Sequence, residues 1–282
     1  MILSVVIITH NEEANIGRTL KSVESLVAHG KGEIVVIDSG SNDRTVEIAQ
    51  SFGARVFVEE WKGYAAQKNS AIEKASGEWI LSLDADEEVE AELVKEILAV
   101  SQANLVEALN SDPNDSLGTA EKVIAIEEGQ ASNSPSGFQV SRKNFFLGRW
   151  IKNGGFWPDP KLRLFRRGAA QFEDRAVHED AKLMKGSTGK LQGALLHHSY
   201  PTLADYIDHM NRYSSLGAGM VKPRDRFSVA NIVVRPMATF LYNYFVRTGF
   251  LDGREGLLLH LYHSTYVSWK YAKAWEASRK KM

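Results

Sequence analysis

Apolar runs rich in β-branched residues alternate with helix-forming segments along the first hundred residues, and this alternation most narrows the choice of fold. The runs are typical of buried strands over 4–8, 33–38, 54–60 and 79–83, and the segments between and after them predict helices over 11–28, 44–52, 64–75 and 89–100. Strands that alternate with helices form parallel βαβ units with right-handed crossovers. The sequence therefore predicts an α/β fold with a Rossmann-like, mostly parallel sheet flanked by helices.

Three polar clusters follow three of these strands. They read "THNEE" after the first strand, "DSGSND" after the second and "DADEE" after the fourth. In open parallel sheets, ligands bind outside the carboxyl ends of the strands. Three clusters at equivalent positions therefore predict one binding site along that edge.

The third cluster crowds acidic residues at a strand end, where their like charges repel. If the segment is extended, Asp84 and Asp86 project on the same side and their carboxylates face one point. Two carboxylates suit a hard divalent cation such as Mg²⁺ or Mn²⁺, which takes its other oxygens from water and phosphate. The alternative is an acidic start to the next helix, where negative charge favours the positive end of the helix dipole.

With these clusters in view, the chain resembles the inverting family-2 glycosyltransferases with a GT-A fold, and in particular the lipopolysaccharide-core β-1,4-glucosyltransferases. The resemblance is carried by "SVVIITHNEE", "VVIDSGSNDRT", "GYAAQKNSAIEKASGEWILSLDADEE" and "AVHED". It covers roughly residues 1–90 and resumes from about 137 to the C-terminus, while 104–137 matches nothing. The motifs specify the fold and nucleotide-sugar chemistry, and they say little about which sugar is transferred.

The resemblance implies a donor site made of residues from all three clusters and from the third helix. It places Thr9, Asn11 and Glu12 beside the base and ribose, Asp38 at the nucleoside, Gln67, Lys68 and Asn69 near the donor, Asp84 and Ala85 near the ribose and metal, and Asp86 on the cation. Read from the residues alone, Asp38 could merely form an Asx turn, and Lys68 could be a solvated helix residue. Asn11 and Glu12 could be a helix cap.

An inverting transfer also needs a carboxylate that takes the proton of the acceptor hydroxyl. The segment "VHED" offers Glu179, which the subgroup pattern favours, and Asp180 as the alternative. A third interpretation is that both are exposed acids at the start of a helix. The segment "KLRLFRRG" alternates apolar and basic residues and predicts a strand with one wet, cationic face. Its Arg163 either holds phosphates of the donor or is simply solvated.

The second half of the chain changes character. The stretch 104–137 is rich in Ser, Asn, Asp, Gly and Pro and predicts a flexible insertion, and helical spacing begins at Thr202. We expect a catalytic domain over 1–200 and a C-terminal helical region over 201–282. Aromatic residues among Arg and Lys suit that region to a lipid headgroup boundary, or equally to an ordinary helical cap or dimer contact. The stretch 229–246 contains Asn, Arg and Pro and is rejected as a membrane span, which needs roughly 18 to 20 apolar residues.

Composition excludes several classes of function. The formal net charge is −1, which gives no reason to expect nucleic acid as a partner, and the absence of cysteine excludes thiolate nucleophiles and fits a reducing compartment. The first strand is not followed by Gly-x-Gly-x-x-Gly, as a dinucleotide site would require, and no P-loop is present. The N-terminus lacks the basic leading region of a signal peptide. We therefore expect a cytoplasmic protein, which a lipid-linked acceptor would bring to the cytoplasmic face of the inner membrane.

The expected activity is metal-dependent inverting transfer of a hexose, with UDP-glucose favoured as donor and a lipid-linked lipopolysaccharide inner-core saccharide as acceptor. Transfer to polyprenyl phosphate or another cell-envelope glycan is the alternative. A non-catalytic nucleotide-sugar-binding protein would share the strand-end clusters without needing Glu179. An aspartyl phosphatase would share Asp-x-Asp but would not predict the clusters at Asn11 and Asp38.

Overall fold

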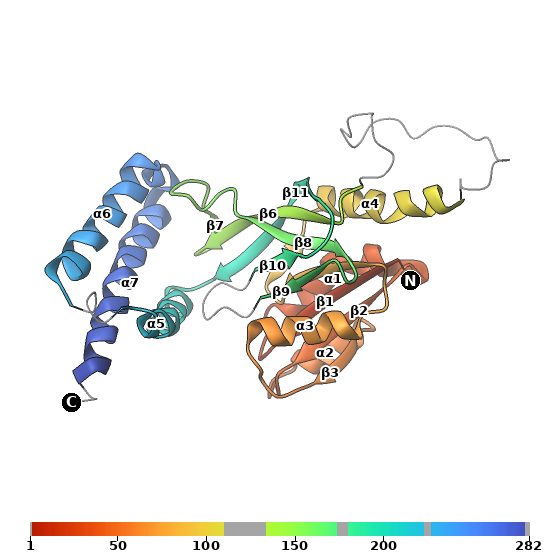
Figure 1. Ribbon diagram of the computed structural model, residues 1–282, viewed down its shortest axis with the longest axis horizontal. Coiled ribbons are helices and arrows are strands. Elements are labelled where there is room, and N and C mark those ends of the chain that lie inside the picture. Colours follow the sequence, from red (N-terminus) through yellow and green to blue (C-terminus); the bar gives the residue numbers. More distant parts are fainter. Residues whose placement is uncertain (1, 110–133, 174–179, 223–226, 280–282) are drawn as a thin grey trace. The chain divides into compact units, whose positions relative to one another are not determined.

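The structure is a computed structural model that describes residues 2–109, 134–173, 180–222 and 227–279 (Figure 1). These residues form two compact units. Unit 1 comprises the described residues within 1–141, 160–174 and 180–195, and unit 2 those within 142–159 and 196–282. We expected the C-terminal region to begin at residue 201. In the structure, residues 142–159 also belong to the unit that contains the C-terminal helices. Most of the expected insertion 104–137 lies outside the described residues.

Nine strands of the described chain form one sheet, in the order β3-β2-β1-β4-β8-β6-β11-β5, with β7 paired to β6. Its members are β1 (Leu3–Thr9), β2 (Gly32–Asp38), β3 (Arg55–Val58), β4 (Trp79–Asp84), β5 (Glu87–Val89), β6 (Gly137–Phe146), β7 (Arg149–Trp150), β8 (Pro160–Arg166) and β11 (Thr188–Tyr200). The strands β9 (Ala170–Phe172) and β10 (Ala181–Leu183) pair separately and antiparallel. The predicted α/β fold is confirmed.

The register of the parallel strands β3, β2, β1 and β4 brings the polar clusters to one edge. β1 aligns Thr9 with Asp38 of β2 on one side, and Ile8 with Asp84 of β4 on the other. β8 then runs antiparallel to β4 and carries Arg163 into the sheet beside it. The geometry that puts three clusters together is therefore set by backbone pairing, before any ligand is considered.

Helices cover both faces of this sheet, because successive residues of a strand point to opposite sides. Val5 and Ile7 of β1 belong to one core, which also contains residues of α1 (Ile16–Val27), α2 (Thr45–Ser51) and α4 (Ala91–Leu109). Val6 belongs to the other core, with Ala71 of α3 (Tyr64–Lys74) and Phe165 of β8. Continuous β-branched runs, buried on both sides, are the sequence signature of this arrangement.

Two local predictions around the acidic cluster differ from the structure. Residues 85–86 form a turn between β4 and β5, so Asp84 and Asp86 are not in one extended segment. The helix expected from residue 89 begins at Ala91, after β5, so Glu87 is not in its first turn. Thr19 of α1 fixes the turn, because its Oγ1 donates to the carbonyl of Ala85 at 2.6 Å.

Unit 2 consists mainly of helices, as expected from Thr202 onward. They are α5 (Leu203–Gly219), η3 (Ala230–Val234), α6 (Arg235–Leu241), η4 (Tyr242–Val246), η5 (Gly249–Asp252) and α7 (Gly253–Arg279). Its core includes Phe146, Ile151, Tyr206, Met210 and Leu259. Among the helices of the described ranges, none is both long and apolar enough to cross a membrane.

A histidine is enclosed at the start of α7. His260 is 1% exposed, and neither of its ring nitrogens has a hydrogen-bond partner within the described part of the chain. A Cβ on Gly154 would lie 2.0 Å from the ring, and one on Gly249 would lie 2.3 Å from it. Both glycines are therefore required by the closeness of the imidazole, whose pKa is lowered by burial to about 4.

Candidate active site

The ends of β1 and β2 are joined through Asp38. Thr9 Oγ1 donates to Asp38 Oδ2 at 2.9 Å, and the amides of Gly40 and Ser41 donate to Oδ1 at 3.0 and 2.8 Å. The side chain of Asp38 is 1% exposed. Gly40 has a φ of +83°, which suits glycine in this turn. Asp38 therefore does form an Asx turn, and it fixes the conformation of the loop that follows β2.

The loops after β1 and β2 are linked to each other by several hydrogen bonds. Asn11, with a φ of +56°, donates its amide to Ser41 Oγ at 2.8 Å and accepts from the Asn42 amide at 2.9 Å. The Glu12 amide donates to Thr45 Oγ1 at 2.7 Å. Asn11 and Glu12 therefore belong to one connected edge.

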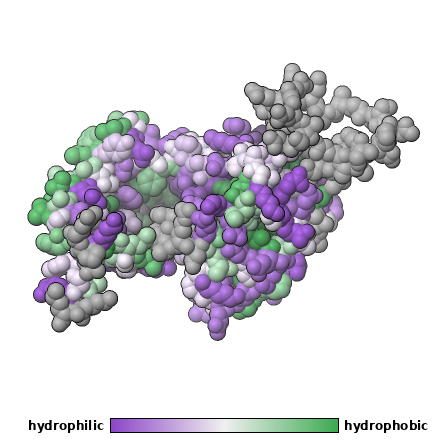
Figure 2. Space-filling model, in the orientation of Figure 1, coloured by the Kyte–Doolittle hydropathy of each residue, from purple (hydrophilic) through white to green (hydrophobic). Residues whose placement is uncertain are grey.

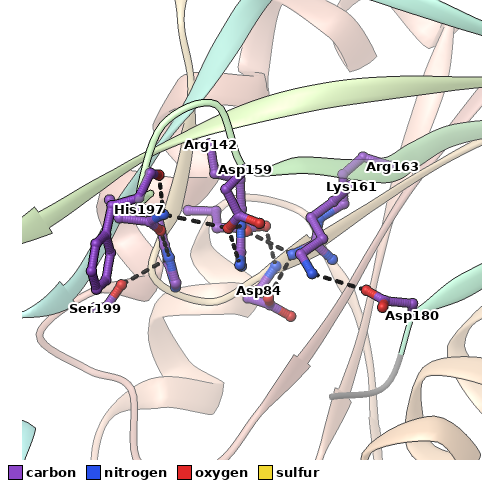
Figure 3. A network of polar contacts seen from close by, with 11 residues as sticks. Asp84, Arg142, Asp159, Lys161, Arg163, Asp180, His197 and Ser199 are labelled. Carbon is purple, nitrogen blue, oxygen red and sulfur yellow. Dashed lines mark hydrogen bonds and ion pairs between the residues drawn. The ribbon is translucent and has the colours of Figure 1, made fainter. Parts of the chain in front are cut away.

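The acids of the third cluster are matched by basic side chains from distant elements. Lys68 Nζ lies 2.8 Å from Asp84 Oδ1, and Arg163 Nη2 lies 2.7 Å from Asp84 Oδ2 (Figure 3). The same Arg163 Nη2 donates to Glu87 Oε1 at 2.6 Å. Glu88, the next acid along the chain, pairs with Arg18 of α1, whose Nε lies 2.6 Å from Glu88 Oε1. Asp84 is thus held between two cations, which relieves the repulsion among these acids.

Arg163 and Glu87 form a buried ion pair. Arg163 is 4% exposed and Glu87 is fully buried. Burial by itself lowers the pKa of the guanidinium, but the charges of Asp84 and Glu87 outweigh it and hold that pKa above its ordinary value. The predicted wet, cationic face of this strand is wrong at Arg163, because residues 163–165 of β8 are buried.

Asp86 lies in the turn beside these residues, half-buried, and its charge reaches Glu12. The pKa of the Glu12 carboxyl is raised by burial and by the negative charges of Asp86, Asp43 and Asp84, against a hydrogen bond from Asn15 that lowers it. Negative potential therefore accumulates where the β1 loop faces the β4–β5 turn. A cation at this point would be favoured.

The three residues expected near the donor on α3 have different surroundings. Gln67 is buried and donates to Ser39 Oγ at 3.1 Å, next to the Asp38 turn. Lys68 points to Asp84. Asn69 instead ties α3 to β9, since its amide group exchanges two 2.9 Å hydrogen bonds with the backbone of Phe172.

Of the two candidates for the catalytic base, only Asp180 lies within the described residues. Glu179 lies outside the described residues. Asp180, the alternative, is described in unit 1, where its Oδ1 lies 3.0 Å from Lys161 Nζ and its side chain is 47% exposed (Figure 3). The choice between the two acids stays a prediction.

A polar network that sequence analysis did not predict lies in unit 2. Arg142 donates to Asp159 Oδ2 through Nε at 2.9 Å and Nη2 at 2.6 Å, and Asn144 Nδ2 reaches the same oxygen at 3.3 Å (Figure 3). His197 Nδ1 lies 2.7 Å from Asn144 Oδ1 and 2.8 Å from Ser199 Oγ. No local pattern in the sequence joins these positions, because they come from three separate segments.

Comparison with known proteins identifies the family. The model of glycosyl transferase family 2 matches residues 4–171. An uncharacterized glycosyltransferase of Rickettsia typhi is 30% identical over 265 residues, covering 91% of this chain and 80% of that protein. The lipopolysaccharide core biosynthesis glycosyltransferase LpsC of Rhizobium meliloti is 29% identical over 285 residues, covering 97% and 92%.

Among solved structures, TarS residues 1–349 of S. aureus in complex with UDP aligns over 100% of this chain and 92% of that one, with a TM-score of 0.47 and 16% identity. The assignment depends on the family model and the relatives in sequence. The residues that they match include the sheet edge described above, with the Asp38 turn and the acidic residues of the β4–β5 turn. The chain belongs to glycosyl transferase family 2.

Proposed function

We propose that this glycosyltransferase is a metal-dependent inverting enzyme that transfers glucose from UDP-glucose to a lipopolysaccharide inner-core acceptor. The observation that carries the proposal is the alignment of Asp38 and Asp84 at the carboxyl ends of β2 and β4, with Lys68 of α3 paired to Asp84 and Asp86 in the turn that follows β4. The LpsC relative, named for lipopolysaccharide core biosynthesis, supports the acceptor class.

In this proposal the nucleoside lies along the edge formed by the first two loops. Thr9, Asn11 and Glu12 contact the base and ribose, and Asp38 positions the turn at the nucleoside. The interloop hydrogen bonds support this role, since they hold the edge in one conformation without any ligand. Gln67 contributes through Ser39, to which it is bonded, and Asn69 through its attachment to β9.

The described residues offer a divalent cation the carboxylates of the β4–β5 turn and no cluster of three acids or histidines, so the ion would take its other oxygens from the diphosphate and water. Asp86 would be its main ligand, with Asp84 and Ala85 beside it, because carboxylate oxygens are what Mg²⁺ and Mn²⁺ prefer. The raised pKa of Glu12, caused by burial and then by surrounding acids including Asp86, supports a site for positive charge. When bound, such an ion would offset the negative charge of the nucleoside diphosphate leaving group.

Lys68 and Arg163 have distinct roles in this scheme. Lys68 supplies a positive charge on the donor side of Asp84. The Nη2 of Arg163 is bonded to both Asp84 and Glu87, so we assign this residue to holding Asp84 in place.

The acceptor hydroxyl attacks the anomeric carbon from the face opposite the leaving group and loses its proton to a carboxylate. We assign this base to Glu179, with Asp180 as the alternative. The Asp180 carboxylate is already paired with Lys161 Nζ, at 3.0 Å, which supports Glu179.

The test is a panel of nucleotide sugars with Mg²⁺, Mn²⁺ or chelator, assayed separately on inner-core lipopolysaccharide and on polyprenyl phosphate. Glu179→Gln should abolish transfer while leaving UDP binding intact, and Asp180→Asn should retain measurable transfer. Transfer only to polyprenyl phosphate would replace the acceptor assignment. Absence of binding to every nucleotide sugar, with or without metal, would refute the donor assignment.

We also infer that the enzyme works at the cytoplasmic face of the inner membrane, where a lipid-linked acceptor would meet a nucleotide sugar. Fractionation of cells with an antibody to this chain tests that placement.

A further inference from the structure

One face of the helical run η3–α6–η4 exposes large apolar side chains. We call this face the apolar stripe. Its members are 48 to 69% exposed, and they are Val229, Val233, Val234, Met237, Leu241, Tyr242, Phe245 and Val246. Figure 2 shows hydrophobic surface gathered over α6, at the left end of the view. Contiguous exposed apolar patches of this kind mark interaction sites.

The spacing shows that these residues form a stripe. Val229, Val233, Met237, Leu241 and Phe245 follow one another at intervals of four. Val229 itself has helical backbone angles, and the helical backbone continues from it to Val246. Residues four apart lie on the same face of a helix. The stripe therefore extends along the whole run.

The opposite face packs on α7 and carries polar groups. Asn231 is 9% exposed, and Ser268 Oγ of α7 donates to the carbonyl of Ile232 at 3.0 Å. Arg235 hydrogen-bonds the hydroxyl of Tyr271. A helix on the surface of a water-soluble protein normally turns its apolar side inward and its polar side outward. Here the outer face is apolar, although the packed side also buries Pro236, so the outer face is suited to a non-aqueous neighbour.

Charge decides which neighbour fits. From residue 227 to residue 251 the sequence contains no Asp or Glu, and it contains Arg235 and Arg247. The Arg247 guanidinium lies over the ring of Tyr242, 5.4 Å from its centroid. Cationic groups beside an apolar face and aromatic rings match the boundary between anionic headgroups and acyl chains. A second copy packed symmetrically on this face would bring like charges together, which is unfavourable.

We propose that the apolar stripe docks on the surface of a bilayer containing anionic lipid, lying in the interface without crossing it. The helices of the described ranges are not apolar and long enough to span a membrane, and Arg235 and Pro236 interrupt the run. The proposal extends the proposed function, because it gives the lipid-linked acceptor a means of reaching the enzyme. It has its own evidence, and its test requires neither donor nor acceptor.

The first experiment is flotation of the full chain with two kinds of vesicle. One contains phosphatidylcholine alone, and the other also contains about 30 mol% phosphatidylglycerol, an anionic lipid. Met237→Glu/Leu241→Glu should lower the partition coefficient for the anionic vesicles at least about tenfold. The control is Leu216→Glu on α5, a leucine of similar exposure (48%) outside the stripe, which should bind like the wild type. Circular dichroism of each variant checks that the fold is retained.

The second experiment uses the absence of native cysteine. Leu241→Cys and Leu216→Cys, each labelled with a polarity-sensitive fluorophore, are mixed with the same vesicles. A blue shift for the label at 241 and none at 216 is expected. Equal shifts at both positions, or flotation of the stripe variant like the wild type, would overturn the proposal. Equal binding to both lipid compositions would overturn its anionic part, and lipid-independent dimerisation abolished by the stripe variant would assign the surface to a second copy.

Discussion

Replacing Arg163 by methionine should destabilise unit 1 by more than an ordinary core substitution. Arg163 is 4% exposed and its Nη2 lies 2.6 Å from Glu87 Oε1, in a position where Glu87 has no exposure to water. Methionine fills much of the same volume but removes the positive charge beside the Glu87 carboxylate. That carboxylate still accepts a hydrogen bond from the Asp84 backbone amide, at 3.0 Å. Removing one partner of a buried ion pair typically costs about 3 to 5 kcal/mol.

The matching double variant separates the pair from its packing. In Arg163→Met/Glu87→Met no buried charge is left without its counterion at this position, and such replacements are often neutral or stabilising. We therefore expect the double variant to be more stable than Arg163→Met, with a coupling free energy of about 2 to 3 kcal/mol. Arg163→Lys keeps the charge but loses the planar guanidinium, so its cost should be intermediate.

Urea unfolding followed by circular dichroism gives the free energy of unfolding for each variant. If the costs of the two single substitutions add to that of the double within about 0.5 kcal/mol, the two residues are not energetically coupled and the reasoning is refuted. Transferase activity provides a second readout. Because Arg163 is proposed to hold Asp84, the double variant should recover stability without recovering kcat.

Three further predictions concern single positions. Asp86→Asn should lower metal-stimulated turnover on the order of 100-fold, whereas Glu92→Gln, on the exposed side of α4, should not; equal losses would contradict the metal assignment. His260 has a pKa lowered by burial to about 4. As pH falls, this histidine is therefore protonated in the unfolded chain before it is protonated in the folded protein. Between about pH 6.5 and 4 the free energy of unfolding should decline by on the order of 3 kcal/mol because of this residue. His260→Gln should flatten that decline in urea titrations at pH 7, 5.5 and 4, and identical slopes would rule out the contribution. Gly77→Ala would place a Cβ 2.6 Å from the Ser4 amide nitrogen and should cost about 1 to 3 kcal/mol by thermal unfolding, while Gly219→Ala, with open space around it, serves as control.

The fold could be predicted from the sequence because its signals are local. Strands covered on both faces need continuous apolar runs, and β1, β2 and β4 have them, so the strand-end clusters follow from parallel topology alone. Helical spacing from Thr202 onward likewise predicted α5. These inferences require only the periodicity of each element and the rule that parallel strands end at the same edge.

The electrostatics of the acidic cluster could not be predicted in the same way. Glu87 follows a strand and precedes a helix, so the local pattern indicates a residue at a helix start. Its partner Arg163 is 76 residues away, and alternation of apolar and basic residues cannot distinguish a wet face from a buried ion pair. The turn at 85–86 depends on Thr19, which is 66 residues distant from Ala85. Contacts at such separations are decided by tertiary packing.

The crossed hydrogen bonds between the first two loops have a consequence for engineering. Asn11 and Glu12 take their positions from Ser41, Asn42 and Thr45. An insertion between residues 40 and 45 would therefore shift the segment after β1 as well, so the two loops would have to be redesigned together. Because these loops hold each other in place without a ligand, the proposed nucleotide would spend little of its affinity on ordering them.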